Sequence, residues 1–182
     1  MTTAALFETP EAPPVIDTAC PFPGRWSLVC TFFAAGTPGP GGSKRAQTYR
    51  RKDGSLVTRA NGTPVVGMID AGGDRTKLWR AVVAHEARIA HRGAPVDAPI
   101  GIVIDFVFAH LKAHKRSNGT VKPYAPLYHT NQPDVLKCAR STEDALSGIV
   151  YADDKLICHE HLSKRYGSES GAQITLWRLE CA

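Results

Sequence analysis

The sequence has no segment long and apolar enough to cross a membrane as a helix. No run of about 18 apolar residues, the length that a membrane-spanning helix needs, occurs among its 182 residues. The N-terminus also lacks the basic start and apolar stretch of a secretory signal. We therefore expect a cytoplasmic protein that has no membrane partner.

Cysteine is scarce and irregularly spaced. The number is odd and no pair has C-x-x-C spacing; the five are Cys20, Cys30, Cys138, Cys158 and Cys181. This usage predicts reduced thiols in a cytosol. His159 and His161 would share one face of a strand and could ligate a metal together. No second cluster offers the spacing of a closed zinc site, which disfavours that interpretation.

Length, charge and proline content predict one domain with an N-terminal arm. A chain of 182 residues is long enough for a single domain with a substantial core. The net charge of +5 and the pI near 9.0 favour a polyanionic partner. Residues 1–24 contain five prolines among small residues, which predicts a disordered or loosely packed arm, so that residues 25–182 form the domain.

The hydrophobic patterns predict an α+β fold with a mixed β-sheet and two main helices, in the order βββ-α-β-α-β-β. In the first helix Leu78, Val82, either His85 or Ala81, and Ile89 have helical spacing, which predicts one apolar face toward the core. Asp105 lies opposite the isoleucines of its strand and needs either a partner or water. The predicted strands are 26–34, 65–69, 99–110, 149–151, 156–166 and 172–179, the last two joined by a hairpin loop, and the helices are 77–91 and 135–146.

The most informative stretch runs from Tyr128 to Ile157. Pro133 disfavours helical backbone in the residue before it, so the helix begins after it, with Asp134 at the N-cap position. Ser147-Gly148 ends this helix, and a short strand then leads to the pair Asp153-Asp154.

Two interpretations of these acids are open. Carboxylates from a helix start and a distant strand end can meet in space and hold a hard cation such as Mg²⁺. Such an ion can activate water and stabilise the charge on a phosphodiester. Alternatively, Asp134 is only a helix cap, and Asp153-Asp154 is only a turn.

The same stretch resembles the RusA-type Holliday junction resolvases of phages and prophages. Their core motif is similar to P-D-x-D-N-L-x-K-x-x-x-D-A-L followed by G-V-hydrophobic-x-D-D, and residues 133–154 follow it without a gap. The resemblance implies a RusA-like fold in a homodimer. It also implies a Mg²⁺-dependent endonuclease, with Mn²⁺ as a substitute ion, that resolves four-way DNA junctions in recombination and repair.

The resemblance also assigns roles to residues of the motif. Asp134 and Asp154 would bind the ion, with Asp153 beside them. Arg140 and Lys137 would hold the scissile phosphate or stabilise its developing charge. A phage-encoded protein of this kind would act in the host cytoplasm.

The chain departs from the family pattern at two positions. Arg140 stands in place of a Lys, and both cations can hold phosphate. Leu136 stands where the family has its second essential Asp, which removes a metal ligand. Glu143 or Asp144, about two turns along the same face of the helix, could supply the missing acid.

Two further classes of function therefore remain beside the nuclease. One is a DNA-junction-binding protein of the same fold with weak or no cleavage, because Leu136 replaces a metal-ligand Asp. The other is a structural phage or DNA-packaging accessory protein, which only the basic charge supports.

A glycine- and proline-rich segment, residues 36–51, predicts an irregular basic loop. Lys44 and Arg45 are its candidate DNA contacts, and a purely solvated loop is the alternative. Asp53-Gly54 and Asn61-Gly62 follow as signals for hairpin turns.

A second basic loop is predicted at residues 111–127, directly before the acidic motif. Lys112, Lys115 and Arg116 are its candidate contacts to a phosphate backbone.

Overall fold

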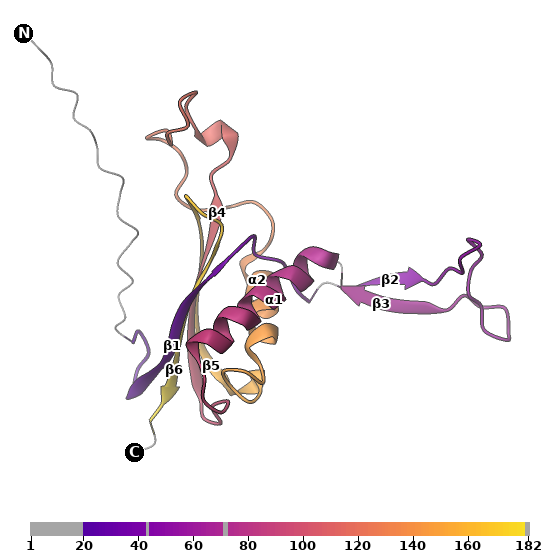
Figure 1. The fold of residues 1–182 in the computed structure, drawn as a ribbon, viewed down its shortest axis with the longest axis horizontal. Coiled ribbons are helices and arrows are strands. Elements are labelled where there is room, and N and C mark those ends of the chain that lie inside the picture. Colours follow the sequence, from indigo (N-terminus) through magenta and orange to yellow (C-terminus); the bar gives the residue numbers. More distant parts are fainter. Residues whose placement is uncertain (1–19, 43, 71–72, 181–182) are drawn as a thin grey trace, which may run out of the picture.

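The computed structural model describes residues 20–42, 44–70 and 73–180. A twisted four-stranded sheet carries two helices on one face, and a two-stranded arm projects far from this body (Figure 1). The elements are β1 Trp26–Ala35, β2 Lys44–Thr48, β3 Val66–Asp70, α1 Gly73–Ala90, β4 Ile100–Ala109, η1 Lys112–His114, α2 Val135–Leu146, η2 Asp154–Leu156, β5 Ile157–Gly167 and β6 Gly171–Leu179. The predicted α+β class with two main helices is confirmed.

The main sheet is mixed, as predicted, and has the order β1-β6-β4-β5. β4 pairs in parallel with β5, whereas β6 runs antiparallel to both of its neighbours, β1 and β4. The predicted hairpin between the last two strands is wrong, because β4 lies between β5 and β6. The short connection 168–170 instead crosses the end of β4, where Ala109 pairs with Gly167 and Val107 with Gly171.

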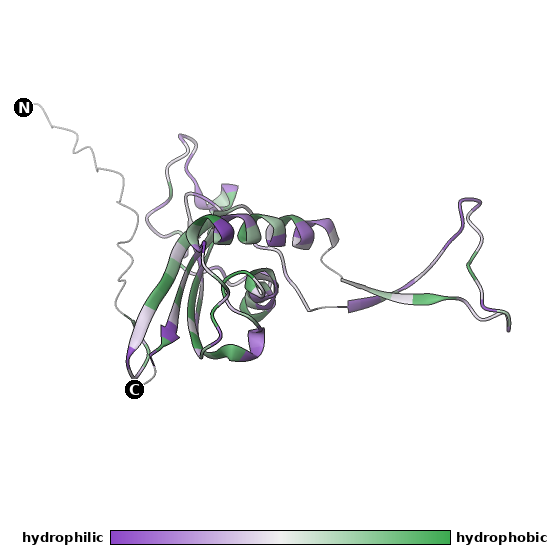
Figure 2. Cartoon of the chain, turned by 60° about the horizontal axis from the view of Figure 1, so that its bottom comes forward, coloured by the Kyte–Doolittle hydropathy of each residue, from purple (hydrophilic) through white to green (hydrophobic). Residues whose placement is uncertain are grey.

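The core lies between the sheet and the helices. In β4 the residues Ile100, Ile102, Ile104 and Phe106 are fully buried, as the alternating pattern predicts. Figure 2 shows the hydrophobic residues concentrated in this sheet, while much of the projecting arm is hydrophilic.

The predicted inner face of α1 is wrong for Leu78 and Ile89, although Val82 does pack against the core. Leu78 and Ile89 are 68% and 54% exposed, whereas Trp79, Val83 and Ala87 form the buried stripe. The large indole of Trp79 decides the rotation of the helix, since it buries much apolar surface and its Nε1 also donates to Thr142 Oγ1 of α2 at 3.0 Å.

Residues 149–151 do not form the predicted strand. Val150 and Tyr151 are buried, but in a turn that continues from α2, where the Val150 N–H donates to the Leu146 carbonyl at 3.0 Å. A short apolar run can be buried in a turn as well as in a strand, and its periodicity does not distinguish the two.

Residues 44–48 are not the irregular loop that was predicted. They form strand β2, which pairs with β3 from Lys44↔Asp70 to Thr48↔Val66. Residues 111–127, predicted as a basic loop, contain the short helix η1 and a turn closed by an isolated bridge between Lys115 and Val121.

The face of the sheet opposite the helices carries both polar and aromatic side chains. On this face the Asp105 carboxylate accepts hydrogen bonds from Arg165 Nε, at 2.5 Å, and from the Ser163 hydroxyl. His159 and His161 both contact the ring of Phe22, each with a ring-centroid distance of 5.2 Å.

Residues 1–19 of the predicted N-terminal arm, and Cys181, lie outside the described residues. Near the end of that arm, Phe22 is buried, and it lies where a side chain at Gly101 would have to fit. Cys20, Cys30, Cys138 and Cys158 carry free thiols. Within the described ranges, no helix has the length and hydropathy to span a membrane.

Candidate active site

A cleft of about 390 Å³ lies where α2, η2 and β5 meet. Three acids and one arginine supply its polar groups, and two apolar residues complete it. The lining residues are Leu136, Ala139, Arg140, Glu143, Asp154 and Glu160.

Helix α2 supplies four of these residues because of their spacing. Leu136, Ala139, Arg140 and Glu143 follow the i, i+3, i+4, i+7 pattern of one helix face. The opposite face is anchored in the core, with Cys138, Ala145 and Leu146 buried among others. Burial of that face therefore determines which side chains of α2 line the cleft.

The start of α2 is tied to the sheet by Lys164 of β5. Its ammonium donates to the carbonyl oxygens of Asn131 and Pro133 at 2.6 and 2.7 Å. Asp134 occupies the N-cap position, as predicted, but its carboxylate accepts no capping hydrogen bond. It forms an ion pair with Lys137 instead, at 3.1 Å, on the surface beside the cleft.

Glu143 is the most perturbed group of the cleft. Burial raises the pKa of its carboxyl to about 7, and the charge and hydrogen bonding of Glu160 add to the effect. Asp144 and Asp154 raise the pKa further. Its Oε1 atom is buried without a hydrogen-bond partner among the described residues.

Asp154 and Glu160 approach Glu143 from two other elements. Asp154 begins η2, and Glu160 lies in β5 beside Ile102 of β4. Asp153, the neighbour of Asp154, does not line the cleft. It accepts a hydrogen bond from the Lys155 N–H at 3.0 Å, which is the main reason that its pKa is lowered.

The two helix acids proposed as substitutes for a missing ligand have different surroundings. Glu143 faces the cleft, whereas Asp144 forms an ion pair with Arg80 of α1 at 2.5 Å. Leu136, which stands in the place of a family acid, lines the cleft and is 68% exposed.

Glu160 was not among the predicted site residues. The sequence did draw attention to its two histidine neighbours, His159 and His161, as metal-ligand candidates. Alternation along β5 places those histidines against Phe22, on the face of the sheet opposite the cleft. The same alternation directs Glu160 to the cleft, so period-2 reasoning from a known strand could have identified it.

The chemistry of these donors fits a hard divalent cation. Carboxylate oxygens are the ligands that Mg²⁺ prefers, and the unpartnered Oε1 of Glu143 is a buried acceptor in need of a positive group. In the conformation described, residues 20–42, 44–70 and 73–180 contain no three His, Cys, Asp or Glu side chains arranged closely enough to hold a metal ion.

The predicted DNA contacts are exposed and lie in two different places. Lys44 and Arg45 are on β2 at the base of the arm. Lys112, Lys115 and Arg116 lie in and directly after η1, beyond the end of β4.

The family model of the endodeoxyribonuclease RusA matches residues 40–177 of the chain. The matched region contains the two-stranded arm of β2 and β3, both helices and every residue of the cleft. No curated protein matches the chain.

Proposed function

Because the chain belongs to the RusA endodeoxyribonuclease family, we propose that it is a Mg²⁺-dependent nuclease that resolves four-way DNA junctions by phosphodiester hydrolysis. The observation that carries the proposal is the raised pKa of Glu143 in a cleft shared with Asp154, Glu160 and Arg140. Mutually repelling acids that hold a proton at neutral pH are poised to exchange that proton for a cation.

Glu143, Asp154 and Glu160 would hold the ion. When bound, Mg²⁺ activates water and stabilises negative charge on the phosphodiester. Arg140 lines the same cleft, and its guanidinium would bind the scissile phosphate. Release of a proton from Glu143 would precede cation binding, so that binding should strengthen as the pH rises through about 7.

Three other residues of the motif would act at the edge of the cleft. Lys137 would contact the DNA backbone and thereby release Asp134 from their ion pair. Asp134 could then reach an ion only after that pair has opened. Asp153 would keep η2 in place through its hydrogen bond from the Lys155 N–H.

A homodimer would place one such cleft at each of two strands of a junction. Sedimentation of the protein alone and with a junction tests this, since two chains for each junction are expected.

The second candidate function is junction binding with weak or no cleavage. The exposed Leu136 favours it, because the cleft has an apolar residue where the family has a ligand. Cleavage of a synthetic four-way junction with Mg²⁺, Mn²⁺ or chelator separates the two functions. Binding without metal-dependent cutting would support the second, and absence of junction binding would exclude both.

A further inference from the structure

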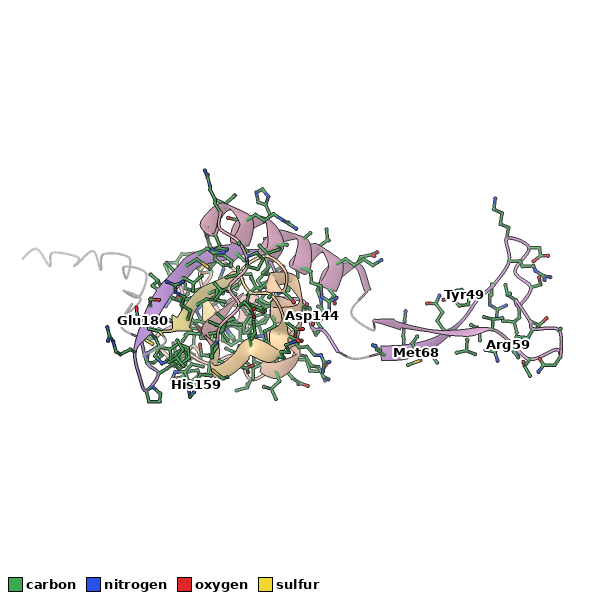
Figure 3. All side chains as sticks on the ribbon, turned by 90° about the horizontal axis from the view of Figure 1, so that it is seen from below. Tyr49, Arg59, Met68, Asp144, His159 and Glu180 are labelled. Carbon is green, nitrogen blue, oxygen red and sulfur yellow. The ribbon has the colours of Figure 1, made fainter. Side chains whose placement is uncertain are left out.

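Most of the net positive charge of the chain lies on one projecting element. Residues 44–70, here called the basic arm, contain six Lys and Arg against two Asp, a net charge of +4 out of +5 for the whole chain. All six cations of the arm are exposed: Lys44, Arg45, Arg50, Arg51, Lys52 and Arg59. The arm projects away from the sheet and helices in Figures 1 and 3.

The arm has a forked end, built on a closed ring of three backbone hydrogen bonds. The Tyr49 N–H donates to the Val65 carbonyl at 3.2 Å, Val65 donates to Val57 at 2.8 Å, and Val57 donates to Tyr49 at 2.9 Å. Beyond this ring the chain separates into two tight turns, residues 51–55 and 59–63, here called the prongs. Val57 lies between the two prongs and meets the two-stranded ribbon at this ring. The ring satisfies the backbone N–H and carbonyl groups at that junction and so gives the fork a defined geometry.

The two prongs have the same construction. Their sequences are RKDGS and RANGT, and in each the backbone N–H of the first residue, an arginine, donates to the carbonyl of the Ser or Thr at 2.8 Å. The Asp or Asn side chain accepts from the backbone N–H and hydroxyl of that Ser or Thr. A third copy, RSNGT at residues 116–120, has the same bonds. Each turn thus presents an exposed arginine, Arg51, Arg59 or Arg116, at its first position.

Residues 40–42, which precede the basic arm, pack against the helix of the candidate active site. The Gly41 N–H donates to the Lys137 carbonyl of α2 at 2.7 Å. Gly42 has a φ of +78°, which favours glycine, and a Cβ there would lie 2.9 Å from Cδ of Arg140, so that the Arg140 side chain would have to move. On the α1 side, Thr76 donates to the Pro40 carbonyl at 2.7 Å. The chain therefore passes beside Arg140, one of the cleft residues, shortly before the basic arm.

We propose that the basic arm is a second DNA-binding element, which lies along duplex DNA leading away from the cleft and contacts its phosphates through Arg51 and Arg59. This rests on the proposed function in one respect only, that the cleft binds DNA. Contacts of this kind are independent of base sequence and release counterions. A two-stranded β-ribbon is also narrow enough to enter the major groove.

The dimensions of the arm fit this role. Six residue steps from Lys44 to Arg50, at about 3.3 Å each, give a reach of about 20 Å. At 3.4 Å per base pair this corresponds to about six base pairs of duplex. The prongs would therefore contact DNA well outside the cleft.

A second copy of the chain is a weaker candidate partner for the arm. Val66 and Met68 are exposed on one side of the ribbon and would favour contact with another protein. Two basic arms, however, would bring two net charges of +4 together, whereas phosphate neutralises them.

The first test shortens the arm without disturbing its base. Residues 50–64 are replaced by Asn-Gly, a two-residue turn suited to joining Tyr49 directly to Val65, with Thr48 still paired to Val66. The variant loses four cations, so the slope of log K against log salt should become shallower by about 2 to 4. It should cut a junction with hairpin-capped arms of about six base pairs at the wild-type rate. We expect the wild type to cut junctions with longer arms faster than those with short arms, and the variant should lose this difference.

The second test keeps the fold of the arm and changes only its charge. Arg51→Ala with Arg59→Ala should make the salt slope shallower by about 2. The matched control, Arg25→Ala with Arg178→Ala, removes two cations at the opposite end of the molecule, where Arg25 pairs with Glu180, and should leave the slope unchanged.

The outcomes separate the arm from the cleft. Unchanged salt slopes in both arm variants, or a loss of dimer mass in place of a change in slope, would overturn the proposal. If the wild-type protein binds DNA but cuts no junction, the proposed function fails while the salt slopes still decide the role of the arm.

Discussion

Replacing Glu143 by Gln should make the protein more stable at alkaline pH and inactive at the same time. In the folded protein the pKa of Glu143 is about 7, against an ordinary value of 4.5, because burial and nearby acids disfavour its charged form. Gln has nearly the same shape and cannot ionise. The substitution therefore removes an electrostatic cost together with a proposed ligand.

The sign of the effect follows from the raised pKa. The folded state binds the proton of Glu143 more tightly than the unfolded state does, so its favourable contribution is complete below about pH 4.5 and is lost as the pH rises through about 7. At 1.36 kcal/mol for each pKa unit, the difference corresponds to about 3 kcal/mol at most. Solvent screening of a partly exposed side chain reduces this to roughly 1–2 kcal/mol.

The assay is urea unfolding of both proteins near pH 4 and pH 8, without metal. We expect equal free energies of unfolding at the acidic pH and a variant more stable by roughly 1–2 kcal/mol at pH 8. Glu169→Gln, at an exposed carboxyl, serves as the control and should change neither value. A variant no more stable than wild type at pH 8 would show that Glu143 carries no electrostatic strain.

Metal ions should stabilise the wild type more than the Glu143→Gln variant. Mg²⁺ or Mn²⁺ at pH 8 should raise the melting temperature of the wild type through binding to the folded state. The same ions should raise that of Glu143→Gln much less. Equal shifts in the two proteins would remove Glu143 from the proposed ligand set even if the urea result holds.

Four further predictions concern the cleft and the DNA. Asp154→Asn should lower junction cleavage at least about 100-fold, since loss of a residue that only orients a metal ligand already costs about 10- to 100-fold, while binding stays intact or tightens; cleavage at the wild-type rate would exclude a catalytic role. Leu136→Asp should leave the cleavage rate at saturating Mg²⁺ unchanged, because Glu143 and Glu160 already supply acids and another like charge raises their cost; a large gain at low Mg²⁺ would instead indicate a missing ligand. Cleavage at limiting Mg²⁺ should rise as the pH increases through about 7, the pKa of Glu143, and a flat pH–rate profile would contradict this. Junction affinity should fall steeply in a salt titration, as expected for several phosphate contacts, and a flat titration would exclude the phosphate backbone as the main contact.

Local sequence patterns were sufficient for much of the fold. The alternation of isoleucine and phenylalanine identified β4 and its buried face, and helix α2 begins and ends where its flanking residues predict. Asp53-Gly54 and Asn61-Gly62 do form tight turns, since the glycine N–H donates three residues back in each case. Positive φ at both glycines explains why those turns could be recognised from composition.

The family motif in residues 133–154 likewise identified the region of the cleft, because its residues are close in sequence. The motif did not reveal how each acid is used. Asp134 and Lys137 pair with one another, and Asp144 pairs with Arg80 of another helix. Such choices depend on neighbours that only the folded chain brings together.

Tertiary structure alone decided the remaining features. The packing of Trp79 against α2 sets which face of α1 is buried. Helical periodicity in the sequence fits that face and the face one residue away equally well. Glu160 joins the cleft because β5 pairs in parallel with β4, a long-range pairing without a local signal. The basic arm forms because β2 pairs with β3 across 17 intervening residues, and this pairing carries most of the net charge of the chain on a ribbon that projects away from the sheet and helices.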